Sequence, residues 1–159
     1  MALNFNGTNI ETIKFNGTAL DKLIYNGVTS WENWVLKSGT YFSTTLEFEM
    51  NGVSTLTKNS SAFTPVKPTK LHINWNISAR DWSGIDHTVT IQGLTESGLW
   101  ITLWSGSRVI DGTTDDSWYV NGEVAVSVTE PIKQLRSTTS GRYWGHNQYI
   151  AITEWYQKG

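Results

Sequence analysis

Apolar and polar residues alternate along most of this chain, which is the pattern of β-strands rather than helices. In residues 71–77 every second residue is apolar, namely Leu71, Ile73, Trp75 and Ile77. The positions between them are polar, namely His72, Asn74 and Asn76. A strand with one apolar and one polar face lies half-buried in an antiparallel sheet. No stretch shows the 3.6-residue period of an amphipathic helix, so the sequence predicts an all-β protein.

The same alternation recurs from Trp34 onward in short runs separated by turn residues, and it predicts about eight strands. These runs cover residues 41–50, 53–57, 71–77, 89–92, 100–104, 123–128, 132–135 and 149–155. Asn51-Gly52 joins the first two runs, and Asn-Gly between alternating residues is a strong hairpin signal. Many short strands with regular turn signals favour a β-sandwich or jelly roll over residues 34–159.

The first thirty residues contain three copies of a short repeat: Phe5-Asn6-Gly7-Thr8, Phe15-Asn16-Gly17-Thr18 and Tyr25-Asn26-Gly27-Val28. A two-residue turn at the first Asn-Gly pairs Leu3 with Ile10 and Phe5 with Thr8. Further turns at residues 11–12 and 21–22 would join the hairpins into one meander with a single apolar face. A sheet this small needs a covering partner. Residues 1–31 therefore either pack on the main domain or on a second copy, or serve as an attachment and oligomerisation module.

These repeats resemble the short Asn-Gly-Thr repeats of tail-associated and virion proteins of phages and prophages. The resemblance covers about the first fifth of the chain. It implies a component of an extracellular particle that is assembled in the bacterial cytoplasm, with residues 1–31 contacting other virion proteins.

A second resemblance lies in the predicted sandwich. Thr88-Val89-Thr90-Ile91-Gln92-Gly93, followed by a polar turn and Trp100, is similar to the strand–turn–strand of galactose-binding-like (discoidin-type) jelly rolls. Residues 131–136 and 149–155 are similar to the last two strands of that fold. The resemblance implies a domain of a kind that most often binds carbohydrates or cell-surface ligands. The loops depart from the family pattern, so no binding residue is carried over from it.

The candidate ligand-binding residues come instead from long predicted loops, because exposed loops on a rigid scaffold commonly carry function. The loop at residues 79–87 contains Arg80, Asp81, Trp82 and His87. The loop at residues 137–147 contains Arg142, Tyr143, Trp144, His146 and Asn147. An aromatic ring beside charged and amide groups suits sugar recognition. The alternative is that Trp82 and Trp144 fold inward and cap the core.

Two loops lie at the same end of an antiparallel sandwich when an even number of strands separates them. The first loop and a second one at residues 105–117 fall at the same end of the sandwich. The loop at residues 137–147 joins them only if residues 118–128 do not form a hairpin around Asn121-Gly122.

Composition removes several classes of function. The 159 residues suit one domain with a small appendage. A net charge of -2 gives no electrostatic case for nucleic acid, and no apolar run is long enough for membrane insertion. There is no cysteine, hence no disulfide or thiolate metal site.

Catalysis and cofactors find little support in the sequence. The hydrolase, metalloprotease and phosphate-loop motifs are absent, so no enzyme activity is expected. No cofactor is expected either. Asp111, Asp115 and Asp116 are candidate calcium ligands, but a solvated acidic turn is the simpler interpretation.

The leading hypothesis is a non-enzymatic phage or prophage virion protein, of the tail or baseplate, whose sandwich binds a saccharide at the host surface. The alternative is a purely structural virion subunit that makes only protein–protein contacts.

Overall fold

A computed structural model describes most of the chain. The described residues are 3–5, 8–10, 14–15, 18–20, 22–25, 28–49, 52–78, 83–111, 117–143 and 145–159. They form strands joined by short turns and contain no helix, so the prediction of an all-β fold is confirmed. No described segment is therefore a helix that could cross a membrane.

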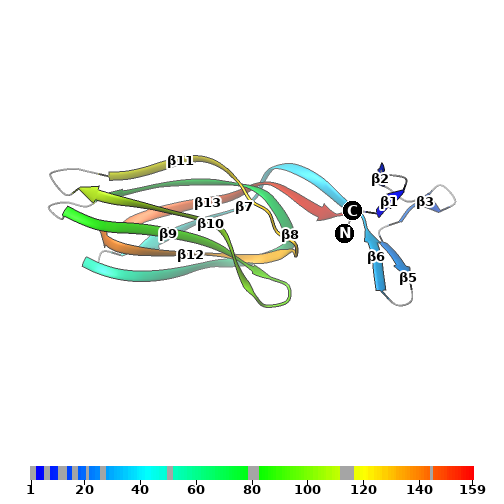
Figure 1. Cartoon of the computed structure of the whole chain (residues 1–159), viewed down its shortest axis with the longest axis horizontal. Coiled ribbons are helices and arrows are strands. Elements are labelled where there is room, and N and C mark those ends of the chain that lie inside the picture. The colour runs from blue at the N-terminus through cyan, green and yellow to red at the C-terminus, as the bar shows by residue number, and fades with distance from the viewer. Residues whose placement is uncertain are drawn as a thin grey trace.

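The N-terminal strands form three separate two-stranded hairpins (Figure 1). They are β1 (Leu3–Phe5) with β2 (Thr8–Ile10), β3 (Lys14–Phe15) with β4 (Thr18–Ala19), and β5 (Lys22–Tyr25) with β6 (Val28–Glu32). Leu3 pairs with Ile10 and Phe5 with Thr8, in the register expected from the repeat. The expectation of one continuous meander is wrong for the described strands, because no strand of one hairpin pairs with a strand of the next.

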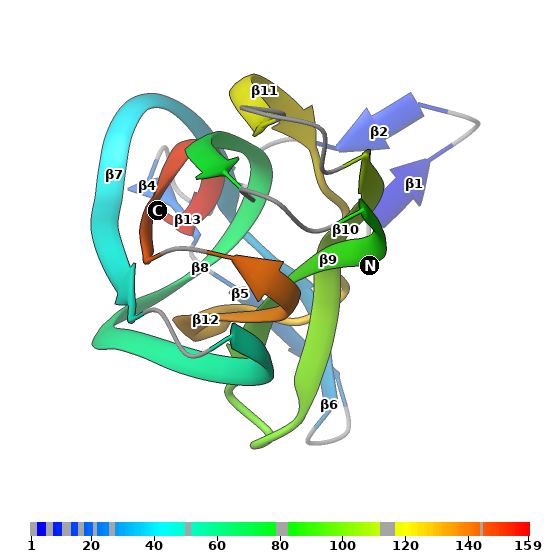
Figure 2. The ribbon, with the colours of Figure 1, turned by 90° about the vertical axis from the view of Figure 1, so that its left-hand side faces the viewer.

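The remaining strands form a two-layered sandwich, seen end-on in Figure 2. Its seven strands are β7 (Trp34–Phe48), β8 (Gly52–Ser78), β9 (Ser83–Thr95), β10 (Trp100–Asp111), β11 (Ser117–Ala125), β12 (Ile132–Tyr143) and β13 (His146–Lys158). All their pairings are antiparallel. We call the layer that contains β9, β10 and β12 the first layer, and the layer that contains β7, β11 and β13 the second layer.

Strand β8 belongs to both layers. Its first half pairs with β12 from Val66 back to Gly52, and its second half pairs with β13 and β11. The change of layer falls near Pro65 and Pro68, where the missing N–H groups interrupt the ladders. Register shifts in the neighbouring strands lie beside this corner. One strand thus takes part in the ladders of both layers.

The core fills the space between the layers with residues from the alternating apolar positions. Its centre is Trp75, whose ring meets the rings of Trp104 and Trp118 edge-on, at centroid distances of 5.3 and 5.7 Å. Such edge-to-face pairs add to the stabilisation that comes from burial alone. Alternation also favours core positions for Trp75, Trp100 and Trp155; Trp75 and Trp155 are buried, whereas Trp100 is half-buried and lies outside the core cluster.

One expected hairpin is wrong, and a second, which the sequence left open, does not form. Asn51-Gly52 does not join paired strands, because β7 pairs with β13 whereas β8 begins in the other layer. Asn121 and Gly122 lie within β11, where they pair with Asn74 and Ile73. The strands also extend into the predicted loops, since β10 continues to Asp111 and β12 to Tyr143.

The hairpins join the sandwich at a junction made by Glu32, Trp34, Lys67 and Lys158. The Lys67 and Lys158 ammonium groups lie 4.4 and 5.5 Å from the centroid of the Trp34 ring. Glu32 accepts a hydrogen bond from Trp34 Nε1 (3.1 Å) and forms an ion pair with Lys158 (3.2 Å). The start of β7 is thereby held against the end of β13.

Candidate functional site

Four chain connections meet at one end of the sandwich, which we call the loop end. They join β7 to β8, β8 to β9, β10 to β11, and β12 to β13. Figure 1 shows these strand ends together, at the end of the sandwich opposite the N-terminal hairpins. Because residues 117–125 form one strand rather than a hairpin, the connection between β12 and β13 lies at the same end as the others. The two layers are also tied here, because Arg108 Nη1 of β10 donates a hydrogen bond to the backbone oxygen of Ser117 (2.8 Å).

Several predicted site residues lie outside the described residues, namely Arg80, Asp81, Trp82, Trp144, Asp115 and Asp116. Residues 79–82 follow β8, residues 112–116 follow β10, and residue 144 follows β12. Asp111 and Tyr143 are the last residues of β10 and β12. In the sequence, these residues lie within or beside segments whose flanking strands end at the loop end.

His87 was expected in a loop. It lies instead on β9, with its side chain pointing inward. Only 1% of His87 is exposed. Its Nε2 forms a short hydrogen bond to the backbone oxygen of Arg142. Gly141 packs directly over this ring, since a Cβ at that position would lie 2.7 Å from His87 Cδ2. His87 is therefore part of the interior that supports the end of β12.

His146 is likewise buried, at 7% exposure, on β13. Its ring stacks on Phe48 with the centroids 5.0 Å apart. Gln148 Nε2 donates a hydrogen bond to His146 Nε2 (2.9 Å), and Gln148 Oε1 accepts one from Ser137 Oγ (2.5 Å). Ser137 lies on β12 and Gln148 on β13, so this chain of hydrogen bonds crosses from one layer to the other.

Burial makes protonation of His146 unfavourable. Removal from water, with a smaller contribution from the nearby His87, lowers the pKa of His146 to about 4. At neutral pH the ring is uncharged and accepts the hydrogen bond from Gln148. The buried histidines thus hold the strand ends beneath the connections and present no surface to a ligand in solution.

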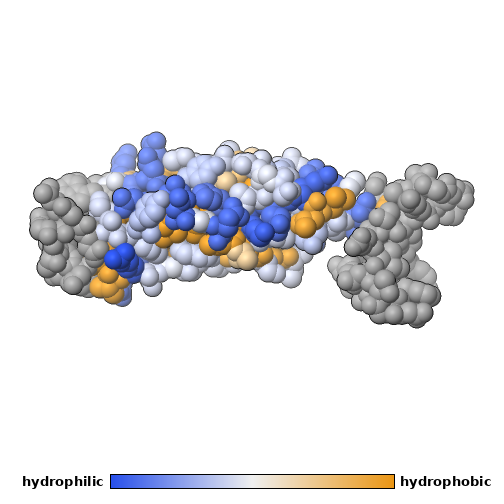
Figure 3. All heavy atoms as spheres, turned by 90° about the horizontal axis from the view of Figure 1, so that it is seen from above, coloured by the Kyte–Doolittle hydropathy of each residue, from blue (hydrophilic) through white to orange (hydrophobic). Residues whose placement is uncertain are grey.

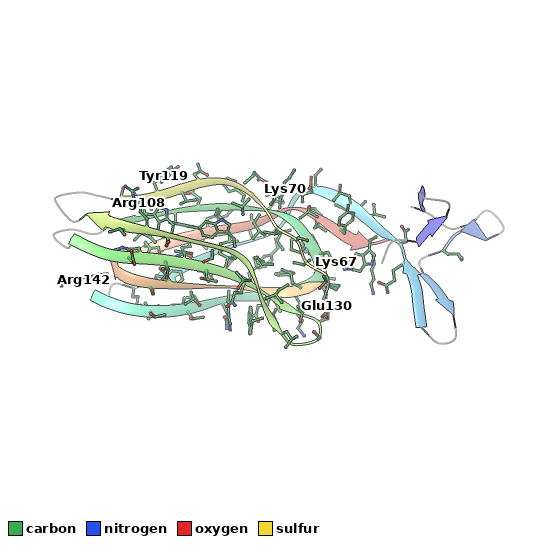
Figure 4. The ribbon with its side chains drawn as sticks, viewed as in Figure 1. Lys67, Lys70, Arg108, Tyr119, Glu130 and Arg142 are labelled. Carbon is green, nitrogen blue, oxygen red and sulfur yellow. The ribbon has the colours of Figure 1, made fainter. Side chains whose placement is uncertain are left out.

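Arg142 and Asn147 differ from the histidines. Arg142 is half-buried on β12, near the loop end (Figure 4). Asn147 is exposed on β13 and lies opposite Glu47 of β7. Among the predicted residues with described side chains, these two are the ones that reach solvent.

The described residues give no support to a metal site, because none of their His, Asp and Glu side chains gather in groups of three or more suited to a metal ion. Of the three calcium candidates, Asp111 is described only as the end of β10, and the other two lie outside the described residues.

The candidate ligand-binding residues were taken from predicted loops. This choice missed a set of polar residues on the outer face of the second layer. Asn74, Asn76 and Asn121 point away from the core there, on the same face as Asn147. The signal was present in the sequence, in the polar positions of residues 71–77. Alternation assigned these positions to the solvent side without distinguishing amides from other polar groups.

No family model matches the chain, and no curated protein matches it. The chain is similar to a solved VP2 subviral particle of infectious bursal disease virus, with a TM-score of 0.42 and 13% identity, over 79% of this chain and 36% of that chain. A T13 viral particle of the same virus gives a TM-score of 0.42 and 10% identity, over 94% of this chain and 41% of that chain. A structure of TmCBM61 in complex with beta-1,4-galactotriose gives a TM-score of 0.34 and 10% identity, over 79% of this chain and 88% of that chain.

The chain therefore spans well under half of the viral proteins that it resembles. At identities of 10 to 13% and TM-scores below 0.5, these likenesses assign neither a family nor a function to it.

Proposed function

We propose that this chain is a non-enzymatic, saccharide-binding subunit of a phage or prophage particle. In this proposal, residues 1–31 attach the subunit to other virion proteins or to a second copy. The loop end of the sandwich then faces the host surface.

One observation carries the proposal: the two candidate contact regions lie at opposite ends of the sandwich. The hairpins enter at the start of β7, beside the end of β13, where Gly159 N donates a hydrogen bond to the backbone oxygen of Asn33 (3.0 Å). The four connections lie at the other end (Figure 1). A subunit built this way keeps its recognition loops clear of the surface to which it is attached.

The residue types at the loop end support recognition of a saccharide. Trp82 and Trp144 supply rings that can cover the apolar face of a sugar, and Arg80 and Asp81 supply hydrogen bonds to its hydroxyls. The buried His87 and His146 take a different part from the one expected, because they support the strand ends from below.

A glycan array of bacterial cell-wall saccharides tests the proposal. The parent chain should bind at least one glycan, and Trp82→Ala and Trp144→Ala should each weaken that binding about tenfold. Trp100→Ala is the matched control, because Trp100 begins β10 at the opposite end and lies under the Arg136 guanidinium, 4.2 Å from the ring centroid. Binding that is unaffected by both loop substitutions would contradict the proposed loop site. A parent chain that binds no glycan would favour the structural subunit.

A further inference from the structure

The outer faces of the two layers have different chemistry. On the first layer, hydroxyl groups on neighbouring strands are hydrogen bonded to one another. Thr57 pairs with Thr138 (2.9 Å), Thr88 with Ser140 (3.0 Å) and Thr90 with Ser105 (3.3 Å). Each of these bonds takes up one of the two O–H donors in its pair, so part of the hydrogen-bonding capacity of this face is already used within the sheet.

The outer face of the second layer carries amides and tyrosines in adjacent positions. Asn74 of β8 lies between Asn121 of β11 and Tyr149 of β13. One step closer to the loop end, Asn76 of β8 lies beside Tyr119 of β11. Asn147 of β13 lies on the far side of Asn76 and pairs with Glu47. We call this set the amide face: Asn74, Asn76, Asn121, Asn147, Tyr119 and Tyr149.

The amides of this face are not hydrogen bonded within the part of the chain that the structure describes. Among the residues that the structure describes, none of the four asparagine side chains forms a hydrogen bond with another residue. Each amide offers two donor hydrogens and an acceptor oxygen. Three of the four asparagines are exposed and the fourth is half-buried. The face therefore presents a dense array of donors and acceptors toward solvent.

The two tyrosine rings flank this array. Tyr119 is 60% exposed, and Figure 4 shows it pointing away from β11 on the outside of the sandwich. Tyr149 is half-buried, and His72 holds its ring edge-on at 6.1 Å between centroids. From the spacing of strands and residues, the two tyrosine positions are roughly 12 Å apart. Rings at this spacing can contact separate units of one extended ligand.

The charges around the face select against an anionic ligand. Glu47 lies at one edge and Glu123 at the other. His72 Nδ1 lies 3.7 Å from a Glu123 carboxylate oxygen, and Thr153 donates a hydrogen bond to the other oxygen (2.8 Å). Lys70 is engaged by Glu154 at 3.2 Å. Figure 3 looks down on the side that carries β11 and shows strongly hydrophilic residues along the middle of the sandwich.

We infer that the amide face binds a neutral polysaccharide lying across β11, β8 and β13. Unpaired amides match the donor and acceptor hydroxyls of such a chain, and exposed tyrosines match its apolar C–H faces. The bordering carboxylates disfavour acidic polymers through like-charge repulsion. This site lies on the side of the sandwich and does not rest on the loop site proposed above.

Native electrophoresis of the full chain, in gels that contain a soluble polysaccharide, tests the inference. The neutral probes are β-glucan, galactan and galactomannan, and the anionic probe is polygalacturonate. At least one neutral polymer should retard the parent chain, and polygalacturonate should retard it less. Asn76→Ala combined with Asn121→Ala should raise the dissociation constant about tenfold or more.

Tyrosine variants separate the ring from its hydroxyl. Tyr119→Ala should weaken binding about tenfold, whereas Tyr119→Phe keeps the ring and should bind nearly as the parent does. The control is Thr90→Ala combined with Thr138→Ala on the first layer, which should leave retardation unchanged. All these positions lie outside the core, so the circular dichroism of each variant should match that of the parent.

The outcomes distinguish this site from the loop site. Loss of retardation in the asparagine and Tyr119→Ala variants, but not after combined Trp82→Ala and Trp144→Ala, supports the amide face and contradicts the loop site. Loss only in the tryptophan variant overturns the amide face and supports the loops. The inference is also overturned if no neutral polymer retards the parent chain, or if polygalacturonate retards it as strongly.

Discussion

Polar side chains that point inward were the residues hardest to predict from the sequence. Ser137, Thr139, His146 and Gln148 occupy positions on β12 and β13 whose side chains point into the core, and all four are buried. Alternation of apolar residues cannot identify such positions, because the residues are polar. Ser137, Gln148 and His146 form an interior chain of hydrogen bonds near the loop end, where a stretch of polar sequence had suggested an exposed loop.

The histidine in this chain of hydrogen bonds makes stability depend on pH. The pKa of His146 is about 4 in the folded chain, against 6.5 for a free histidine, because burial excludes the charged form. Between these values the unfolded chain binds a proton that the folded chain does not, so stability falls as pH falls from 6.5 to 4. The expected loss in the free energy of unfolding is about 3 kcal/mol, measurable by urea denaturation across this range.

Two variants isolate the contribution of His146. His146→Gln should be less stable than the parent at pH 7 and should lose most of the pH dependence between 6.5 and 4. His72→Gln removes a histidine from the outer face, and it should keep that dependence. Parallel stability curves for the parent and His146→Gln would show that another group is responsible.

At the scale of single elements, local signals predicted strands well but predicted their partners poorly. The repeat correctly paired Leu3 with Ile10, because a two-residue turn fixes the register of its own hairpin. The same dipeptide wrongly predicted a hairpin at Asn51-Gly52, and it forms none at Asn121-Gly122, where the sequence left the choice open. In both cases pairing with strands distant in sequence outweighs the local preference. Strand ends were also missed where Ser, Thr and Arg continue a ladder, as in residues 137–143.

The candidate site was predictable only as a region. Strand parity placed two connections at one end, and the remaining uncertainty came from reading Asn121-Gly122 as a turn. The outward amides were visible as the polar half of residues 71–77. Their grouping with Asn121 and Asn147 depends on which strands flank β8, and alternation carries no such information.

The junction between β7 and β13 gives a test at the same scale. Lys158→Ala removes the ion pair to Glu32 and one of the two cations over Trp34. Because Lys158 is 58% exposed, the free energy of unfolding should fall by less than about 1 kcal/mol. The local effect should be larger, and hydrogen exchange should become faster at Gly159 N, which is bonded to Asn33.

Hydrogen exchange resolved by mass spectrometry measures this effect. Lys133→Ala, on β12 away from the junction, is the control and should leave the exchange of residues 153–159 unchanged. Unaltered exchange in Lys158→Ala would show that the backbone pairing of β7 with β13 holds the junction without these side chains.

For the whole molecule, we expect the sandwich to fold without the N-terminal hairpins. Among the residues whose burial the structure describes, every member of the buried apolar cluster lies between Leu46 and Trp155. Removal of residues 1–31 should therefore change the free energy of unfolding by less than about 1 kcal/mol, with a single transition on heating. Light scattering should show a smaller assembly than the parent chain forms. An unchanged assembly size would contradict the proposed attachment role.

The long strands of the sandwich run between its two ends, as Figure 1 shows, and β7 alone extends over 15 residues. A subunit fixed at its hairpins and pulled at its loops would experience tension along these strands. Backbone hydrogen bonds in antiparallel sheets lie perpendicular to the strands, so such tension loads many of them in shear at the same time. Rupture would then require whole ladders to fail together, so a subunit held in this way should resist force along its long axis.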